Sequence, residues 1–218
     1  MAGVKEQPAL SAHGLVEFMT SSFQAREDIL RRYKYQYPGQ KVFAPYYQVT
    51  IAAIRAYHRA ANDPAVLASA AEKLAQKLRF ETRPKVQVRL RENMRAIASY
   101  ERNFGSRRFE VPAQTRVPAL AISGVSITCN PDLQVIEGGQ RLVISLHCAM
   151  TTPEEEAVAS LGQLMHTAYR QLRDIAPGQV RFLSVQSGAE AAWNGRGKKR
   201  WPQIQAACRQ IHALWPHI

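Results

Sequence analysis

The stretch from Gly124 to Met150, GVSITCNPDLQVIEGGQRLVISLHCAM, sets the architecture that we predict for this chain of 218 residues. Its residues alternate between apolar and polar and many are β-branched, which is the pattern of short, half-buried strands. Residues 137–140, Glu-Gly-Gly-Gln, are predicted to form a hairpin turn. We therefore expect three short strands, and Asp132 falls where the second of them begins.

Helical patterns lie on both sides of this stretch. The predicted helices begin after Ser11 and after Ser21 or Ser22, then span residues 46–62, 64–80, 85–104 and 153–175, with a last helix near the C-terminus. A further strand is predicted at 179–186, and residues 1–9 are expected to be loose. This order predicts an α/β (α+β) fold, in which a helical N-terminal region, 1–84, precedes a small mixed sheet flanked by helices in residues 85–218.

Composition restricts the class of protein. Hydrophobic residues make up 46% of the chain, enough for one sizeable core, and no window is apolar over the roughly 18 residues of a membrane span. The N-terminus has no secretory pattern, so we expect a soluble, cytoplasmic protein. Cys129, Cys148 and Cys208 are odd in number and far apart, so buried reduced thiols are expected rather than disulfides or a zinc site.

The chain is strongly basic, with a formal net charge of +12 and a pI of about 10.0. Such a surface attracts polyanions, and nucleic acid is the commonest of these in cells. Tyr33, Tyr35 and Tyr37 lie among the cations and are expected either to stack on bases or to pack in the core. Phosphate contacts are predicted for Arg31, Arg32, Lys34, Arg107, Arg108, Arg196, Lys198, Lys199 and Arg200. The alternatives are a solvated basic surface or a contact with an acidic protein.

The order of a helix, three strands, a helix and a strand resembles the core of the PD-(D/E)XK nuclease superfamily, in particular its RecB-like branch. In that family an aspartate on the second strand and an acidic residue or glutamine on the third hold a divalent ion, and a lysine two residues later acts on the attacking water. Asn130, Pro131 and Asp132 match the aspartate motif. Ser11, Leu15 and Phe18 are similar to the family's opening helix.

The third strand departs from the family pattern. Ser145 and His147 stand where the acidic residue and the lysine are expected, and they keep the spacing that puts both side chains on one face of a strand. Serine is a poor magnesium ligand, and histidine is neutral for much of the time at pH 7. The resemblance therefore implies a nucleic-acid-binding protein, with DNA favoured over RNA, whose nuclease site is lost or altered and which needs no cofactor. Defence, repair and mobile-element machinery are the roles that fit it.

Two other functions stay open. The first is an active nuclease, in which Asp132 binds Mg²⁺ with Glu101 or with the carboxylates of 154–156, and His147 replaces the lysine. The second is a subunit of a larger assembly that contacts a protein through its basic surface. Each candidate side chain also has a plain structural interpretation: Asp132 as a turn residue, His147 as a core histidine and Glu101 as a solvated carboxylate. The sequence contains no P-loop, dinucleotide-binding, zinc-protease or nucleophile-elbow motif.

Overall fold

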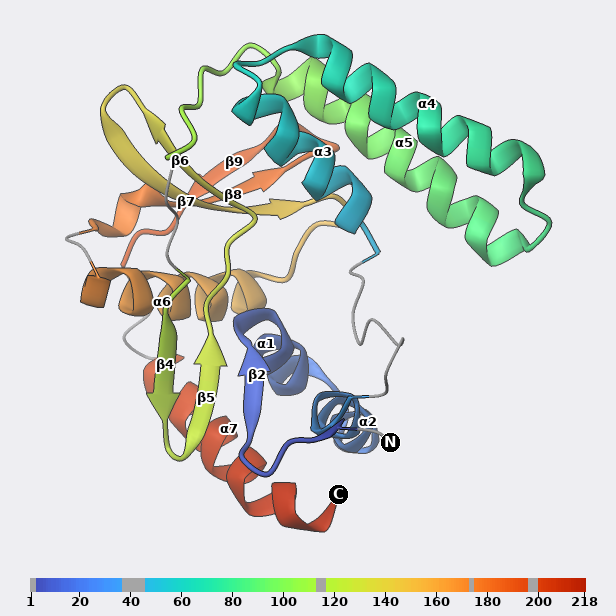
Figure 1. Ribbon diagram of the computed structural model, residues 1–218. Helices are drawn as coiled ribbons and strands as arrows, with labels where there is room; N and C mark the ends of the chain where they lie inside the picture. Colours follow the sequence, from blue (N-terminus) through green and yellow to red (C-terminus); the bar gives the residue numbers. More distant parts are fainter. Residues whose placement is uncertain (1–2, 37–45, 113–116, 173–174, 196–199) are drawn as a thin grey trace.

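The computed structural model describes residues 3–36, 46–112, 117–172, 175–195 and 200–218. It confirms the α+β class, with a helical N-terminal part followed by two mixed sheets that are flanked by helices (Figure 1). The helices are α1 (Ala12–Thr20), α2 (Phe23–Lys34), α3 (Gln48–Arg59), α4 (Pro64–Phe80), α5 (Pro84–Phe104), α6 (Glu155–Leu172) and α7 (Arg200–Leu214). Short 3-10 turns lie at Pro177–Gln179 and Trp215–His217.

The helix starts follow local signals in the sequence. The Ser11 hydroxyl accepts from the Gly14 N–H, and the Ser22 hydroxyl from the Ala25 N–H, so both serines cap their helices as predicted. The Asp63 carboxylate caps α4 in the same way, and a proline occupies the first turn of both α4 and α5.

The larger sheet has the order β6-β7-β8-β9, and the smaller sheet has the order β2-β5-β4. The strands are β1 (Gly3–Val4), β2 (Ala9–Ser11), β3 (Tyr35–Gln36), β4 (Ala119–Ile122), β5 (Val125–Thr128), β6 (Leu133–Glu137), β7 (Gln140–His147), β8 (Val180–Ser184) and β9 (Glu190–Ala192). The three predicted strands are β5, β6 and β7. Gly138 and Gly139 have φ angles of 55° and 78°, so the predicted hairpin turn between β6 and β7 is confirmed.

The N-terminal residues are not loose as predicted. Residues 3 and 4 pair with 36 and 35, and β2 lies parallel to β5, with Leu10 opposite Ile127. A strand of three residues is too short to show a period in the sequence, and its partner lies more than a hundred residues away. Packing against the smaller sheet therefore overrides the polar character of this segment.

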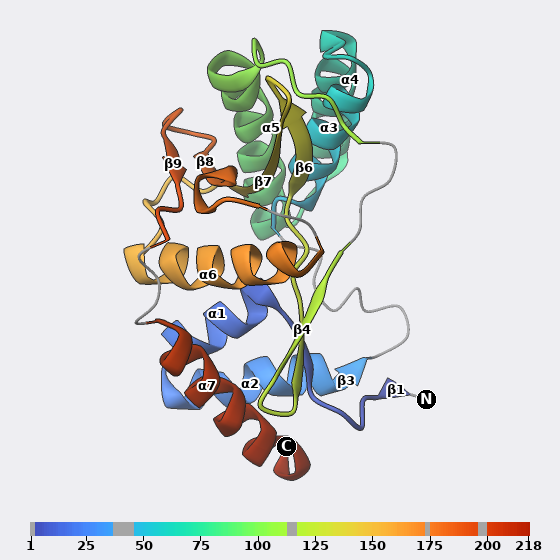
Figure 2. The same ribbon diagram turned by 90° about the vertical axis from the view of Figure 1, so that its left-hand side faces the viewer.

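Two hydrophobic cores lie on opposite faces of the larger sheet, and α6 lies between the two sheets (Figures 1 and 2). Along β7, Val143 belongs to the core formed with α1, α2, α6 and α7, whereas Leu142 and Ile144 belong to the core formed with α3, α4 and α5. Successive residues of a strand point to opposite faces, so one strand supplies both cores. These cores do not follow the predicted division at residue 84, because α3 and α4 pack with α5.

A buried histidine links α3 to α5. The ring of His58 contacts the Tyr100 hydroxyl through Nε2 at 2.6 Å and the Asn62 side chain through Nδ1 at 2.7 Å. Burial is the main cause that lowers the pKa of His58, and the charge of Arg107 lowers it further, while the bond to Asn62 opposes both. The folded protein therefore favours neutral His58.

We expect the free energy of unfolding to fall as the pH drops from about 7.5 to about 5.5. The unfolded chain protonates His58 near its ordinary pKa of 6.5, whereas the folded chain resists that proton, so stability is lost as the pH falls below 6.5. In His58→Gln this loss is smaller. Urea unfolding at several pH values measures it, with His217→Gln, at an exposed position, as the control. An equal pH dependence in wild type and His58→Gln would contradict the assignment.

Candidate functional site

Asp132 lies where the chain passes from the smaller sheet to the larger one. Its Oδ2 accepts a hydrogen bond of 2.7 Å from the Leu146 N–H of β7. Arg55, on α3, donates through Nε to the carbonyl of Asp132 and through Nη2 to the carbonyl of Pro131. These bonds hold both the side chain and the backbone of Asp132 against the start of β6.

The pKa of the Asp132 carboxyl is raised from its ordinary value, and several neighbouring groups act on it. Burial is the dominant influence and raises its pKa, although the residue as a whole keeps some access to solvent. His13, the Leu146 N–H and Arg55 act in the opposite direction and favour the charged form. Cys148 lies close enough for its thiol pKa, which burial raises to about 12, to respond also to Asp132. Groups from α1, α3 and β7 thus converge on this carboxyl.

His13 is a residue of this site that the sequence analysis missed. It is exposed in the first turn of α1, and its charge acts on Asp132. It follows the helix cap Ser11 by two residues, and no local pattern distinguishes it from a surface histidine. Only the tertiary structure brings the first turn of α1 close enough for His13 to act on Asp132.

Ser145 and His147 share one face of β7 with Val143, as their spacing predicts. Together with His13 they line a cavity of about 510 Å³. The cavity lies between the larger sheet, α1 and the beginning of α6, and most of its walls are apolar. His147 Nε2 contacts the Thr151 carbonyl, whereas the Ser145 hydroxyl has no hydrogen-bond partner among the described residues.

The carboxylates expected to complete a metal site lie elsewhere. Glu101 is exposed on α5, where its charge acts on Tyr57, and Glu156 pairs with Arg200. Within the described ranges, no three His, Cys, Asp or Glu side chains are grouped so that they could hold a metal ion. In this part of the chain, the ligand set of the alternative nuclease is not assembled around Asp132.

Several of the predicted phosphate-binding residues are engaged within the protein. Arg32 pairs with Glu17 at 2.7 Å, and the exposed Arg31 approaches Glu27 at 3.4 Å. Lys34 donates to two carbonyls at the C-terminus of the chain. The tyrosines nearby are structural as well, since the Tyr33 and Tyr35 hydroxyls make hydrogen bonds inside the protein. Tyr37 lies outside the described residues.

Two further arginines hold elements together. Arg107 pairs with Glu137 and Glu190 and stacks on Phe109, so it fixes the end of the β6-β7 hairpin against β9. Arg108, its neighbour, is exposed.

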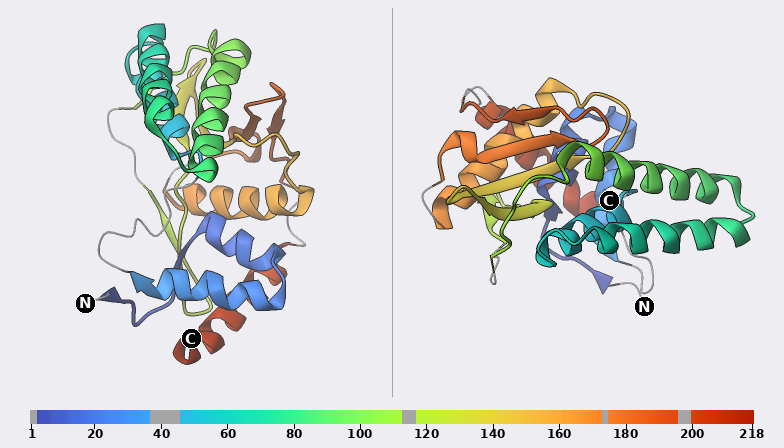
Figure 3. Two further views of the ribbon diagram at one scale, coloured as in Figure 1. Left: turned by 90° about the vertical axis from the view of Figure 1, so that its right-hand side faces the viewer. Right: turned by 90° about the horizontal axis from the view of Figure 1, so that it is seen from above.

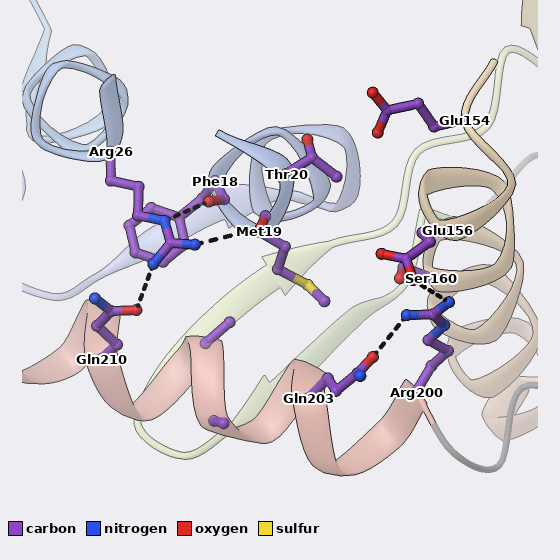
Figure 4. A pocket seen from close by; sticks show the side chains of 12 residues that line it. Phe18, Met19, Thr20, Arg26, Glu154, Glu156, Ser160, Arg200, Gln203 and Gln210 are labelled. Carbon is purple, nitrogen blue, oxygen red and sulfur yellow. Dashed lines mark hydrogen bonds and ion pairs between the residues drawn. The ribbon is translucent and has the colours of Figure 1, made fainter. Parts of the chain in front are cut away.

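Arg200 lies in a cleft of about 530 Å³ between α1, α6 and α7 (Figure 4). It bonds to Glu156 and Gln203, while Arg26, at the other end of the cleft, bonds to Gln210 and to carbonyls of α1 (Figure 4). Arg196, Lys198 and Lys199 lie outside the described residues.

Half of the net positive charge lies on a different part of the molecule. We call residues 48–104, which form α3, α4 and α5, the basic arm. It contains 11 lysines and arginines and five aspartates and glutamates, so it carries +6 of the net charge of +12 in about a quarter of the chain. Helices α4 and α5 project from the body of the protein (Figures 1 and 3). Residues 162–218, a segment of equal length, also carry +6, with eight lysines and arginines and two acidic residues, so a charge count alone does not single out the arm.

The cations of the basic arm include several that form no ion pair or hydrogen bond within the described part of the chain. All of them are exposed: Arg59, Lys73, Lys77, Arg79 and Lys85. They contrast with Arg107 and Arg200, which are already neutralised by carboxylates.

No protein-family model, curated protein or solved structure matches this chain. The family resemblance stays a prediction, and the chemistry of the site is inferred from its own residues. In the described ranges, no helix combines the length and the apolar character that crossing a membrane requires.

Two substitutions at Asp132 separate its charge from its hydrogen bond. Asp132→Asn keeps an acceptor for the Leu146 N–H, so we expect a free energy of unfolding at pH 7 equal to or above that of wild type. Asp132→Ala leaves that N–H without its partner and is expected to cost about 1–3 kcal/mol. Urea unfolding measures both.

The pH dependence provides the control. Because the pKa of Asp132 is raised above 3.8 in the folded state, wild type loses stability from this residue as the pH rises above 3.8. Asp132→Asn removes that decline. If Asp132→Asn is as unstable as Asp132→Ala at pH 7, the charge itself, attracted by Arg55 and His13, is what stabilises the junction.

Proposed function

We propose that this protein binds nucleic acid, with DNA favoured over RNA, through the exposed cations of its basic arm, and that it does so without metal-dependent cleavage. The main support is the distribution of charge. Half of the net charge lies on the arm, and five of its cations have no partner in the described structure. Cations that are free to contact phosphates release counterions from nucleic acid, which is the chief source of sequence-independent affinity.

The spacing of the arm's cations fits an extended backbone of phosphates. Lys73 and Lys77 are one turn apart on the same face of α4. Arg91, Arg95 and Arg102 are separated by four and seven residues, so they form a row along α5, and all three are exposed. Arg95 pairs with Glu92 at the surface, and single surface ion pairs of this kind are weak.

The tip of the arm adds a second kind of contact. Phe80, the last residue of α4, is 86% exposed and is preceded by Arg79. A lone aromatic ring beside cations is suited to stacking on a base, because every base has an aromatic face. The surface therefore combines charge with a stacking platform.

The altered site supports binding over cleavage. Ser145 and His147 replace the residues that the family resemblance assigns to metal and water, and the Asp132 carboxylate already accepts a hydrogen bond from the Leu146 N–H. Binding to a phosphate backbone needs charge and shape and no metal ion. This scaffold can therefore hold nucleic acid after the chemistry of a nuclease has been lost.

A triple variant tests the arm. We expect Lys73→Gln, Lys77→Gln and Arg79→Gln together to weaken binding to single- and double-stranded DNA and to RNA. They should also flatten the plot of log affinity against log salt by about 2–3 units of slope, at roughly 0.7–0.9 per lost phosphate contact. Fluorescence anisotropy across a range of salt concentrations measures both effects.

The matched control removes three positive charges elsewhere, with Lys5→Gln, Arg170→Gln and Arg209→Gln, none of which lies on the arm or is predicted to contact phosphate. Its salt dependence should stay near that of wild type. Equal losses in the two triple variants would mean that net charge, not the arm, determines binding. No binding of wild type to any of the nucleic acids would favour the assembly subunit, which contacts a protein through its basic surface.

We also expect no cleavage of these substrates by wild type in Mg²⁺ or Mn²⁺. Gel analysis after long incubation is the measurement, and Asp132→Ala is the control. Cleavage that requires the metal and disappears in Asp132→Ala would replace the proposal with an active nuclease that has a noncanonical site.

A further inference from the structure

The cavity beside Ser145 and His147 lies at the carboxyl ends of two parallel strands. Strands β7 and β8 pair in parallel, and the final residues of both line the cavity, together with Gln186 just beyond β8. Ligands commonly bind in the crevice outside the carboxyl ends of parallel strands. With a volume of about 510 Å³, the cavity is large enough for a small organic group.

The walls of the cavity suit a neutral ligand better than an anionic one. Among the described residues, no lysine or arginine lines it, although the chain has a net charge of +12. Its acidic residue, Glu190, is bound by Arg107 and Arg181. Val16, Leu161 and Phe182 give it apolar sides. A phosphate group would find no lysine or arginine here, only the rings of His13 and His147.

One end of the cavity is polar. The Ser145 hydroxyl lies there without a hydrogen-bond partner in the described structure, beside the ring of His147, and His13 also lines the cavity. A wholly apolar ligand would leave that hydroxyl unpaired, which is unfavourable in a buried site. A flat, neutral ring with hydrogen-bonding groups along one edge can pack against the apolar walls and form hydrogen bonds at the polar end.

The row of arginines on α5 leads to the rim of this cavity. Arg102 donates to the Ser99 hydroxyl at 3.4 Å, and that hydroxyl donates to Gln186 Oε1 at 2.9 Å. Gln186 lines the cavity and is itself held by a bond from its Nε2 to the Cys148 carbonyl. A phosphate bound at Arg102 would therefore lie two hydrogen bonds away from Gln186, a residue that lines the cavity.

We infer that this cavity takes one unstacked nucleobase of a strand that the basic arm holds. The inference rests on the proposed function, since the arm supplies the phosphate contacts. Unstacking a base from a duplex costs a few kcal/mol, so single-stranded or mismatched sites are preferred over a perfect duplex. The ligand is defined by its chemistry, a neutral heteroaromatic ring, which a strand or a free nucleoside can provide.

The test uses the full chain and a single-stranded DNA oligonucleotide that contains 2-aminopurine, a base whose fluorescence rises when it leaves the stack. Wild type is expected to increase the fluorescence at least twofold on binding. Ala157→Trp fills the cavity from α6 and should abolish this increase and weaken binding about tenfold. Ala206→Trp fills the other cleft and is the matched control, with the signal of wild type.

A smaller substitution distinguishes loss of binding from loss of folding. Ser145→Ala removes only the hydroxyl, and it should keep the stability of wild type while weakening oligonucleotide binding several-fold. Calorimetry with free adenosine tests whether the cavity binds the ring of a free nucleoside as well as a base within a strand. Binding of adenosine without binding of the oligonucleotide would support the ring site and contradict the proposed function.

One combination of results would contradict base binding in the cavity and leave the proposed function intact. Suppose that wild type binds the oligonucleotide with strong salt dependence, while the 2-aminopurine signal is flat and Ala157→Trp binds as wild type does. The cavity then takes no base, and the proposed function stands. Binding of neither adenosine nor the oligonucleotide would overturn both.

Discussion

The bond between the Asp132 carboxylate and the Leu146 N–H is the constraint on which the rest of this structure depends. Strand β6 begins at Leu133, opposite Ile144, so the end of β7 extends past its antiparallel partner. The carboxylate takes the place of the missing strand there and satisfies a backbone donor. Arg55 then fixes the carbonyls of the same turn. The two hydrophobic cores meet here, because His13 comes from α1 and Arg55 from α3.

The hydrogen bond and the charges around Asp132 limit the chemistry that its carboxylate can perform. A carboxylate that accepts from a backbone N–H, close to an arginine and a histidine, already has partners for its charge. Ser145 and His147 meanwhile line a neutral, mainly apolar cavity on the next strand. Asp132, just before β6, and Ser145 and His147, at the end of β7, thus lie at the same end of this strand pair, and the described residues form no metal-ligand group there.

The fold also divides the positive charge of the chain into two classes. Arg107 and Arg200 bridge elements through carboxylates and so contribute to the architecture. On the basic arm, five cations stay exposed and form no ion pair within the described residues: Arg59, Lys73, Lys77, Arg79 and Lys85. The same formal charge therefore has opposite consequences: paired cations stabilise the fold, and unpaired cations make a surface for polyanions. A mainly apolar cavity, which no lysine or arginine lines among the described residues, complements that surface.

The sequence by itself determined the features that depend on neighbouring residues. Serine caps and first-turn prolines predict where helices begin, paired glycines predict the β6-β7 turn, and the strand period puts Ser145 and His147 on one face. The free, buried state of the three cysteines also followed from their number and spacing. Only the tertiary structure decided which distant groups meet. The pairing of β2 with β5, the approach of His13 to Asp132 and the ion pairs of Arg107 join residues far apart in the chain. Such contacts are set by packing of whole elements, and no local pattern encodes them.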